Sequence, residues 1–225
     1  MKIAVLGTGM VGRALASRLD QLGHDVTVGT RDPQATLART DADAMGNPPY
    51  AVWADEHPGV RLTPLAEAAA GAEVVINASH GHASLEMLAL AGADNLVGKV
   101  LLDIANPLDF SAGMPPTLFV KDTDSLGEQI QRAFPDALVV KTLNTLNADL
   151  MAHPDQLPEP TSVFLSGNDT DAKTTATTLL TQLGHTDIID LGDITTARGT
   201  EMLLPIWLRL MTALDTPTFN FKIVR

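Results

Sequence analysis

The chain has no cysteine among its 225 residues. Disulfides, zinc–thiolate sites, iron–sulfur clusters and thiol nucleophiles are therefore excluded. Three other catalytic signatures are also missing, namely GxSxG, HExxH and a Ser–Lys pair. No lysine occupies the helical position expected of the base in a hydroxyacid or imine reductase, which argues against that chemistry.

Basic residues are scarce. Fifteen Lys and Arg stand against 27 Asp and Glu, which gives a formal net charge of -12. The electric field of this negative charge repels nucleic acid and anionic lipid, so we expect neither as a partner. Any phosphate must be bound by local basic residues.

Long apolar runs are absent too. The longest, "MLLPIWLRLM", is interrupted by Pro205 and Arg209 and is shorter than the ~20 residues that cross a bilayer. The chain opens directly on an apolar strand, without the charged and apolar regions of a signal peptide. We expect no membrane association and a cytoplasmic protein.

The first half alternates apolar runs with helical periodicity. Lys2 to Leu6 and Val26 to Gly29 are predicted strands, separated by a helix that ends at Gly23. Asp32–Pro33 is a helix start, since an acidic cap precedes proline. Residues 40–63 are expected to be a loop followed by a short strand at 60–63.

Later apolar runs continue the pattern as "AEVVINAS", "KVLLDIAN" and "ALVVKTLN", with helices expected over 84–91 and 125–134. After "MAHPDQLPEP" come a strand, a helix over 171–183, a strand, and one long helix over 196–214. This alternation predicts an α/β protein with a doubly wound parallel sheet. We expect a nucleotide-binding domain over 1–150 and a smaller C-terminal α/β part over 151–225.

The stretch "GTGMVG" places Gly7, Gly9 and Gly12 in GxGxxG spacing between a strand and a helix. In that context the first glycine allows a tight turn, the second admits a pyrophosphate and the third permits close helix–strand packing. The phosphates would rest on the helix N-terminus. The alternative is a tight strand-to-helix connection without a ligand. We favour a Rossmann dinucleotide site.

The acid that usually follows the second strand in NAD sites, about 20 residues after the turn, is missing. The strand instead ends in Thr30 and Arg31, which can donate to a 2′-phosphate. Asp32 is assigned to the cap of the next helix. These residues favour NADP, although a solvated surface role for Arg31 remains the alternative.

Polar residues gather where three predicted strands end, and in an open α/β sheet the ligand crevice lies at those ends. His80 and His82 have only Glu86 as a nearby third ligand, so no metal site is expected. The histidines are more simply pocket residues than acid–base groups, and Lys141 in mid-strand is consistent with buried structure. A reaction that needs only hydride alignment would explain the lack of an obvious acid or base. The polar residues at the three ends are Asn77, Ser79, His80 and His82; Asn106; and Asn144, Thr145 and Asn147.

Taken together, "KIAVLGTGMVGRALASRLDQLGHDVTVGTRDP", "LVVKTLNTLNADLM", "GNDTDAK", the block "LLTQLGHTDIIDLGDITTARGTEMLLPIWLRLM" and the ending "FNFKIV" resemble the F-420:NADP oxidoreductase family. More distantly, the chain is similar to the cytosolic reductase domain of six-transmembrane ferric reductases. Arg198, Glu201 and Pro205 are among the more telling positions.

The resemblance implies hydride transfer between C4 of NADPH and C5 of the deazaflavin ring of coenzyme F-420. It implies pocket positions at Ser79, His80, Asn144 and Thr145, and acceptor and dimer contacts in the C-terminal part. The expected cofactor-binding residues are Gly7, Thr8, Gly9, Met10, Val11, Gly12, Thr30, Arg31, Asn77, Ala78, Ser79 and Asn106.

The "NASHGHAS" and "NTLNAD" turns depart from the family's archaeal members. FMN or FAD therefore stays open as the acceptor, as do a small carbonyl or imine substrate and a non-catalytic NADP sensor. The apolar C-terminal helix suggests a homodimer, with burial against the first domain as the alternative.

Overall fold

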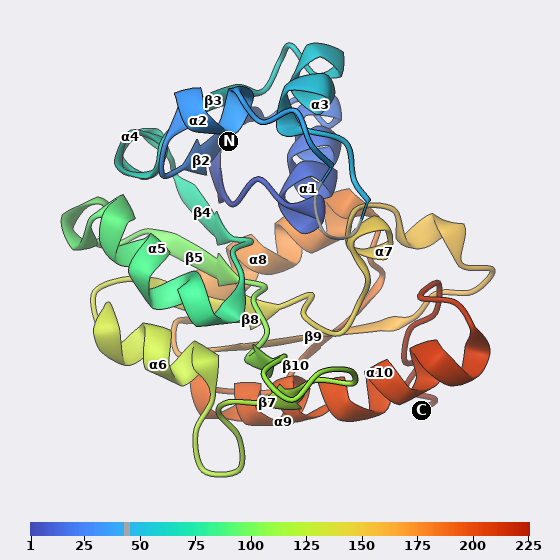
Figure 1. Ribbon diagram of the computed structural model, residues 1–225. Helices are drawn as coiled ribbons and strands as arrows, with labels where there is room; N and C mark the ends of the chain where they lie inside the picture. The colour runs from blue at the N-terminus through green and yellow to red at the C-terminus, as the bar shows by residue number, and fades with distance from the viewer. Residues whose placement is uncertain (43–45) are drawn as a thin grey trace.

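The computed structural model describes residues 1–42 and 46–225. Its centre is a sheet with the strand order β10-β9-β8-β5-β4-β1-β2-β3 (Figure 1). The strands of this sheet are β1 Lys2–Leu6, β2 Asp25–Thr30, β3 Arg61–Pro64, β4 Val74–Asn77, β5 Val100–Asp103, β8 Leu138–Thr142, β9 Ser162–Gly167 and β10 Asp187–Asp190. A separate hairpin pairs β6 Leu108–Asp109 with β7 Thr117–Leu118.

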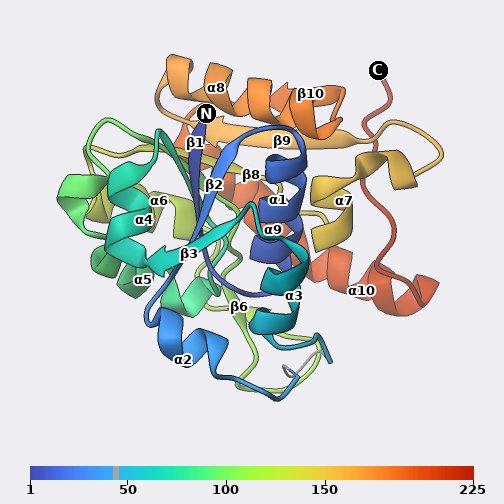
Figure 2. The same cartoon turned by 90° about the horizontal axis from the view of Figure 1, so that it is seen from above.

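Helices cover both faces of the sheet, because the strands are apolar on both sides (Figure 2). One apolar core packs beneath α1 Met10–Gln21, α3 Tyr50–Glu56, α7 Ala148–Ala152 and α8 Thr170–Leu183. The other packs beneath α4 Leu65–Gly71, α5 Ser84–Ala91, α6 Leu126–Ala133 and α9 Ala197–Met202. The shorter α2 spans Pro33–Leu37, and α10 spans Leu204–Leu214. The predicted α/β Rossmann architecture is confirmed.

The C-terminal strands join the same sheet but break its parallel order. β9 pairs with β8 antiparallel, whereas β10 is parallel to β9. The predicted parallel sheet therefore holds for the six strands from β8 to β3, and the two C-terminal strands run in the opposite direction. The boundary at residue 150 stays a prediction.

Two helices differ from expectation. Within the segment expected to be a loop over 40–63, α3 begins directly after Pro49, because a proline is tolerated at a helix start; residues 43–45 lie outside the described residues. The single helix expected over 196–214 is two helices that meet at Leu203. Pro205 has no N–H to continue the first helix, so α10 starts afresh around it.

A buried lysine ties the C-terminal part to the sheet. Lys141 on β8 is fully buried, and its Nζ lies 2.8 Å from Asp103 Oδ2 on β5 and 2.9 Å from Glu201 Oε1 on α9. Burial alone would lower the pKa of Lys141, but the two carboxylates outweigh it and hold this pKa above its usual range. Glu201 also accepts the N–H groups of Leu126 and Gly127, at the start of α6.

Replacing that cation should destabilise the folded protein. We expect Lys141→Met to lower the free energy of unfolding by about 3–5 kcal/mol, because two carboxylates would remain buried without their cation. Urea denaturation at pH 7 measures the loss. The control is Lys121→Met, at an exposed lysine, which should change the unfolding midpoint very little. Equal stabilities for the two variants would contradict the central role of Lys141.

Tyr50, the first residue of α3, gives a second test of packing. It is 3% exposed, and its hydroxyl has no hydrogen-bond partner. Burial raises the pKa of Tyr50 to about 12, against a smaller opposite effect of Arg13. Since this pKa exceeds the ordinary tyrosine value of 10.0, Tyr50 favours folding below pH 10, and that contribution is lost as the pH rises toward 12.

Tyr50→Phe should therefore equal or exceed the parent in stability at pH 7, since it removes a buried hydroxyl without a partner. Between pH 10 and about 12 it should lose less stability than the parent protein. Because the chain has a single tyrosine, phenolate absorbance follows this one side chain directly. A phenolate transition at the value of a free tyrosine would overturn the assignment.

Candidate functional site

The site forms where β1 and β4 lie side by side. The chain leaves β1 for α1 on one face and β4 for α5 on the other, so the carboxyl ends of these two strands open a crevice. This change of direction is the point at which open α/β sheets bind ligands. The glycine turn after β1 and the Asn77–Ala78–Ser79 turn after β4 therefore face the same space.

The glycine turn is packed too tightly for side chains at two positions. Gly7 has φ +136°, and a Cβ there would lie 2.5 Å from the Ala78 carbonyl oxygen. A Cβ on Gly12 would lie 2.1 Å from the Gly7 carbonyl oxygen. Above Gly9, in contrast, no atom lies within 4 Å of a Cβ position. That open space over the turn is where a pyrophosphate would approach.

The start of α1 supplies the donors for such an anion. Gly9 is the N-cap, no side chain caps the helix, and its first turn carries no acid. The first N–H groups of a helix, here those of Met10 and Val11, have no partner within the helix. Arg13 braces the turn from behind, with Nε donating to Thr8 O at 2.8 Å and Nη1 to Pro48 O at 2.6 Å.

The end of β2 has an arrangement that its sequence did not reveal. Asp32 caps α2 by accepting the Ala35 N–H at 3.0 Å, which confirms its predicted role. The Thr36 hydroxyl donates to Asp32 O and lies 2.9 Å from the Thr30 hydroxyl. Since Thr36 has only one proton, Thr30 must donate to Thr36. The predicted contact of the Thr30 hydroxyl with phosphate therefore requires the hydroxyl to rotate.

Arg31 remains available at the same strand end. Its side chain is 62% exposed, and the one ion pair it forms among the described residues is with Glu86, with 3.9 Å between Nη1 and Oε1. A cavity of about 260 Å³ lies beside it, bounded by Gly7, Gly29, Thr30, Arg39 and Met87. This position suits the adenosine end of a dinucleotide.

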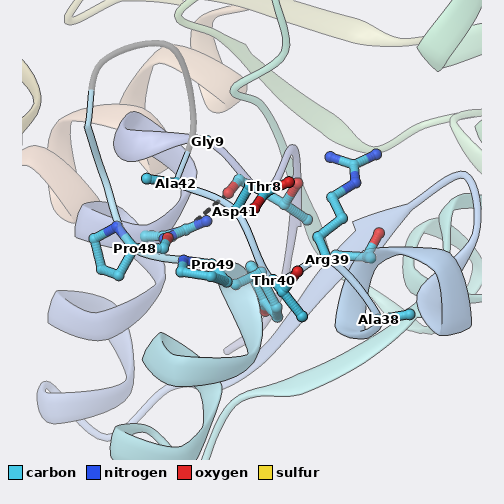
Figure 3. A pocket seen from close by; sticks show the side chains of 12 residues that line it. Thr8, Gly9, Ala38, Arg39, Thr40, Asp41, Ala42, Pro48 and Pro49 are labelled. Carbon is cyan, nitrogen blue, oxygen red and sulfur yellow. Dashed lines mark hydrogen bonds between the residues drawn. The ribbon is translucent and has the colours of Figure 1, made fainter.

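A larger cavity of about 550 Å³ adjoins the first (Figure 3). Thr8, Thr36 and Arg39 line both cavities. Arg13 and Tyr50 contribute to its far wall. Sequence reasoning missed Arg39 because this residue follows a short helix in a segment without a recognisable motif.

On the β4 side, the predicted contact residues divide into buried and accessible ones. Asn77 is completely buried; its amide donates to Asp103 Oδ1 at 2.8 Å and Ser84 Oγ at 3.1 Å. Its Oδ1 accepts the Ser79 hydroxyl at 2.6 Å. The Asn77 side chain therefore shapes the turn, and Ser79 and the backbone of Ala78 lie closer to the crevice.

The two histidines lie against the β6–β7 hairpin. The His82 ring stacks on Phe119 with 4.1 Å between centroids, and the exposed His80 ring lies 6.0 Å from Phe110. Across the described residues, no group of three His, Asp or Glu side chains is arranged to hold a metal ion. The hairpin forms an aromatic border beside Ser79.

A reciprocal amide pair joins the other two strand ends. Asn106 Nδ2 donates to Asn144 O at 2.8 Å, and Asn144 Nδ2 donates to Asn106 Oδ1 at 3.0 Å and to Thr200 O at 3.1 Å. The preceding Leu143 is buried with φ +59°, a strained conformation for a branched side chain. Asn144 and Thr145 are both 3% exposed, so Asn106 is the more accessible of these predicted residues.

The C-terminal residues that carry the family resemblance, Arg198, Glu201 and Pro205, have structural roles. Arg198 pairs with Glu128 on α6 through two hydrogen bonds of 2.8 and 2.5 Å. Glu201 reaches Lys141, and Pro205 separates α9 from α10. Throughout the described chain, no helix combines the length and apolar character needed to cross a membrane.

Comparison with known proteins agrees with this geometry. Residues 2–107 match the family model described as NADP oxidoreductase, coenzyme F420-dependent. An F420-dependent NADP reductase from Methanothermobacter marburgensis is 28% identical over 214 residues, 93% of this chain and 92% of the relative. Metalloreductase STEAP3 from Rattus norvegicus is 29% identical over 92% of this chain, which spans only 38% of that relative.

Solved structures give a fuller match. The crystal structure of a candidate F420-dependent NADP reductase from Arthrobacter sp. FB24 is 62% identical, covers 100% of both chains and has a TM-score of 0.95. An imine reductase from Aspergillus terreus, 19% identical with a TM-score of 0.63 over 94% of this chain and 62% of its own, shares the fold alone. The chain belongs to the family of coenzyme F420-dependent NADP oxidoreductases, a family of NADP-dependent oxidoreductases.

Proposed function

We propose that the protein transfers a hydride between NADPH and the deazaflavin coenzyme F420. The observation that carries this is the contact between the two turns: Gly7 packs directly against Ala78, so a dinucleotide on the glycine turn reaches the turn that contains Ser79. The full-length similarity to the Arthrobacter protein supports the choice of acceptor.

The residues around the glycine turn suit the chemistry of the cofactor. The open space over Gly9 and the first N–H groups of α1 would hold the pyrophosphate, and Arg31 would contact the 2′-phosphate. NADPH supplies the hydride when bound. The cofactor-binding set proposed here is Gly7, Thr8, Gly9, Met10, Val11, Gly12, Thr30, Arg31, Asn77, Ala78, Ser79 and Asn106, with Asn77 acting through Ser79 and Thr30 through its hydrogen bond to Thr36.

The protein's own contribution is orientation. Ser79 is held by Asn77, and Asn106 and Asn144 hold each other, so three strand ends present a rigid polar border. His80 and the β6–β7 hairpin would cover the acceptor ring from the side and limit access of water. Placing donor and acceptor carbons in contact supplies much of the rate of a hydride transfer.

We also infer a homodimer that acts in the cytoplasm. Met202, Ile206 and Leu214 form an exposed apolar stripe at multiples of four residues along α9 and α10. Trp207 faces inward instead and stacks on Phe219 at 5.2 Å. A stripe of this kind, next to a buried aromatic residue, is typical of a subunit contact.

The direct test mixes the purified protein with NADPH and oxidised F420, and in separate samples with FMN or FAD. We expect loss of both F420 and NADPH absorbance in the first sample and much slower reaction with the flavins. If FMN or FAD is reduced faster than F420, the flavin and not F420 is the acceptor. If NADPH binds but no acceptor is reduced, the hydride-transfer proposal fails and a sensor becomes the better reading.

Arg31→Ala tests the cofactor assignment in the same assay. Losing a charge-assisted contact with phosphate should raise the KM for NADPH roughly 10- to 100-fold, with little change for NADH. Arg132→Ala is the control, because Arg132 is 59% exposed and pairs with Asp124 at a distant position before α6. Equal effects of Arg31→Ala on both nucleotides would contradict a 2′-phosphate contact.

A further inference from the structure

Arg39 lies in the loop after α2, between the two cavities beside the glycine turn. It is exposed and lines both the cavity of about 260 Å³ at the end of β2 and the one of about 550 Å³ next to Thr8. Figure 3 shows the side chain extended from the loop, with no hydrogen bond to the other residues drawn. Within residues 1–42 and 46–225 it forms no ion pair.

The Thr30 and Thr36 hydroxyls near Arg39 already use their protons in hydrogen bonds within the protein. Thr30 donates to Thr36, and Thr36 donates to the Asp32 carbonyl, so both hydroxyls offer only lone pairs to a ligand. Both threonines are also more than nine-tenths buried. A phosphate dianion needs donors, and these two side chains supply none in this arrangement.

The cationic donors that line the smaller cavity are the two guanidinium groups. Arg31 and Arg39 line the same 260 Å³ cavity, Arg31 from the end of β2 and Arg39 from the segment after α2. Three carboxylates oppose these cations: Asp32 lines the same cavity but caps α2, Glu86 lies 3.9 Å from Arg31, and Asp41 lines the larger cavity. In a protein with a net charge of -12, two convergent cations mark a place that favours an anion.

We propose that Arg39 is a second phosphate-binding residue, which closes on the 2′-phosphate of NADP opposite Arg31 and determines the preference for NADP over NAD. The inference rests on the proposed use of NADP and is independent of the acceptor. Thr30 and Thr36 then have a positioning role: their hydroxyl chain joins the end of β2 to α2 and sets where the loop carrying Arg39 begins. Guanidinium groups suit this task because they bind phosphate oxygens in pairs.

The test measures binding of NADPH and NADH to the full-length protein without any acceptor, by titration calorimetry. Arg39→Ala should weaken NADPH roughly 10- to 100-fold and leave NADH within about twofold. Arg39→Lys should lose less, because the charge is kept and only the paired geometry is lost. Arg61→Ala is the matched control: Arg61 is as exposed as Arg31 but pairs with Asp25, at the opposite end of the strands.

Two further variants separate this proposal from its alternatives. Thr30→Val should change NADPH and NADH binding in parallel. A selective loss of NADPH binding would show that the Thr30 hydroxyl contacts the 2′-phosphate, and would contradict the positioning role assigned to Thr30. Asp41→Asn should tighten NADPH binding by removing an opposing charge from the larger cavity. An Arg39→Ala protein that binds NADPH like the parent, or loses both nucleotides equally, refutes the role of Arg39. A lack of F420 turnover would leave these binding results unaffected, so the two failures remain distinguishable.

Discussion

The buried cation of Lys141 is the interaction on which the rest of the structure depends. It joins β8 to β5 through Asp103 and to α9 through Glu201, and Glu201 in turn accepts two N–H groups at the start of α6. Asp103 continues the chain of contacts to Asn77 and so to Ser79. A single charge in the core thus connects the C-terminal helices to the turn that contains Ser79. Buried charges are costly without partners, and here every member of the group has one.

The two sides of the crevice are built in different ways. The side proposed for the cofactor uses backbone groups and residues close in sequence: a glycine turn, the start of α1 and the end of β2. The side proposed for the acceptor uses groups from distant segments, such as the Asn106 and Asn144 side chains and the Thr200 carbonyl. A site of the first kind can be recognised in the amino-acid sequence as a motif. The second depends on how β5, β8 and α9 pack, and its residues follow no common spacing.

This difference explains which predictions held. The strands, the glycine turn and the Asp32 cap depend on local conformation, and the structure confirms them. The antiparallel β9 was missed because its direction depends on how the segment after β8 packs, and the break at Leu203 because it depends on one missing N–H at Pro205. The burial of Asn77 could not be read from its place at a strand end, since polar residues there can face either the crevice or the core.

By itself, the sequence determined an α/β protein with a dinucleotide turn and without a strand-end acid, because glycine spacing, apolar periodicity and residue type act over a few neighbouring positions. Only the tertiary structure decided where hydroxyl protons go and which charges converge. Thr30 turns toward Thr36, and Arg39 comes to line the same cavity as Arg31. The direction of a hydroxyl and the meeting of two guanidinium groups are set by packing between segments, and a linear pattern carries no record of that packing.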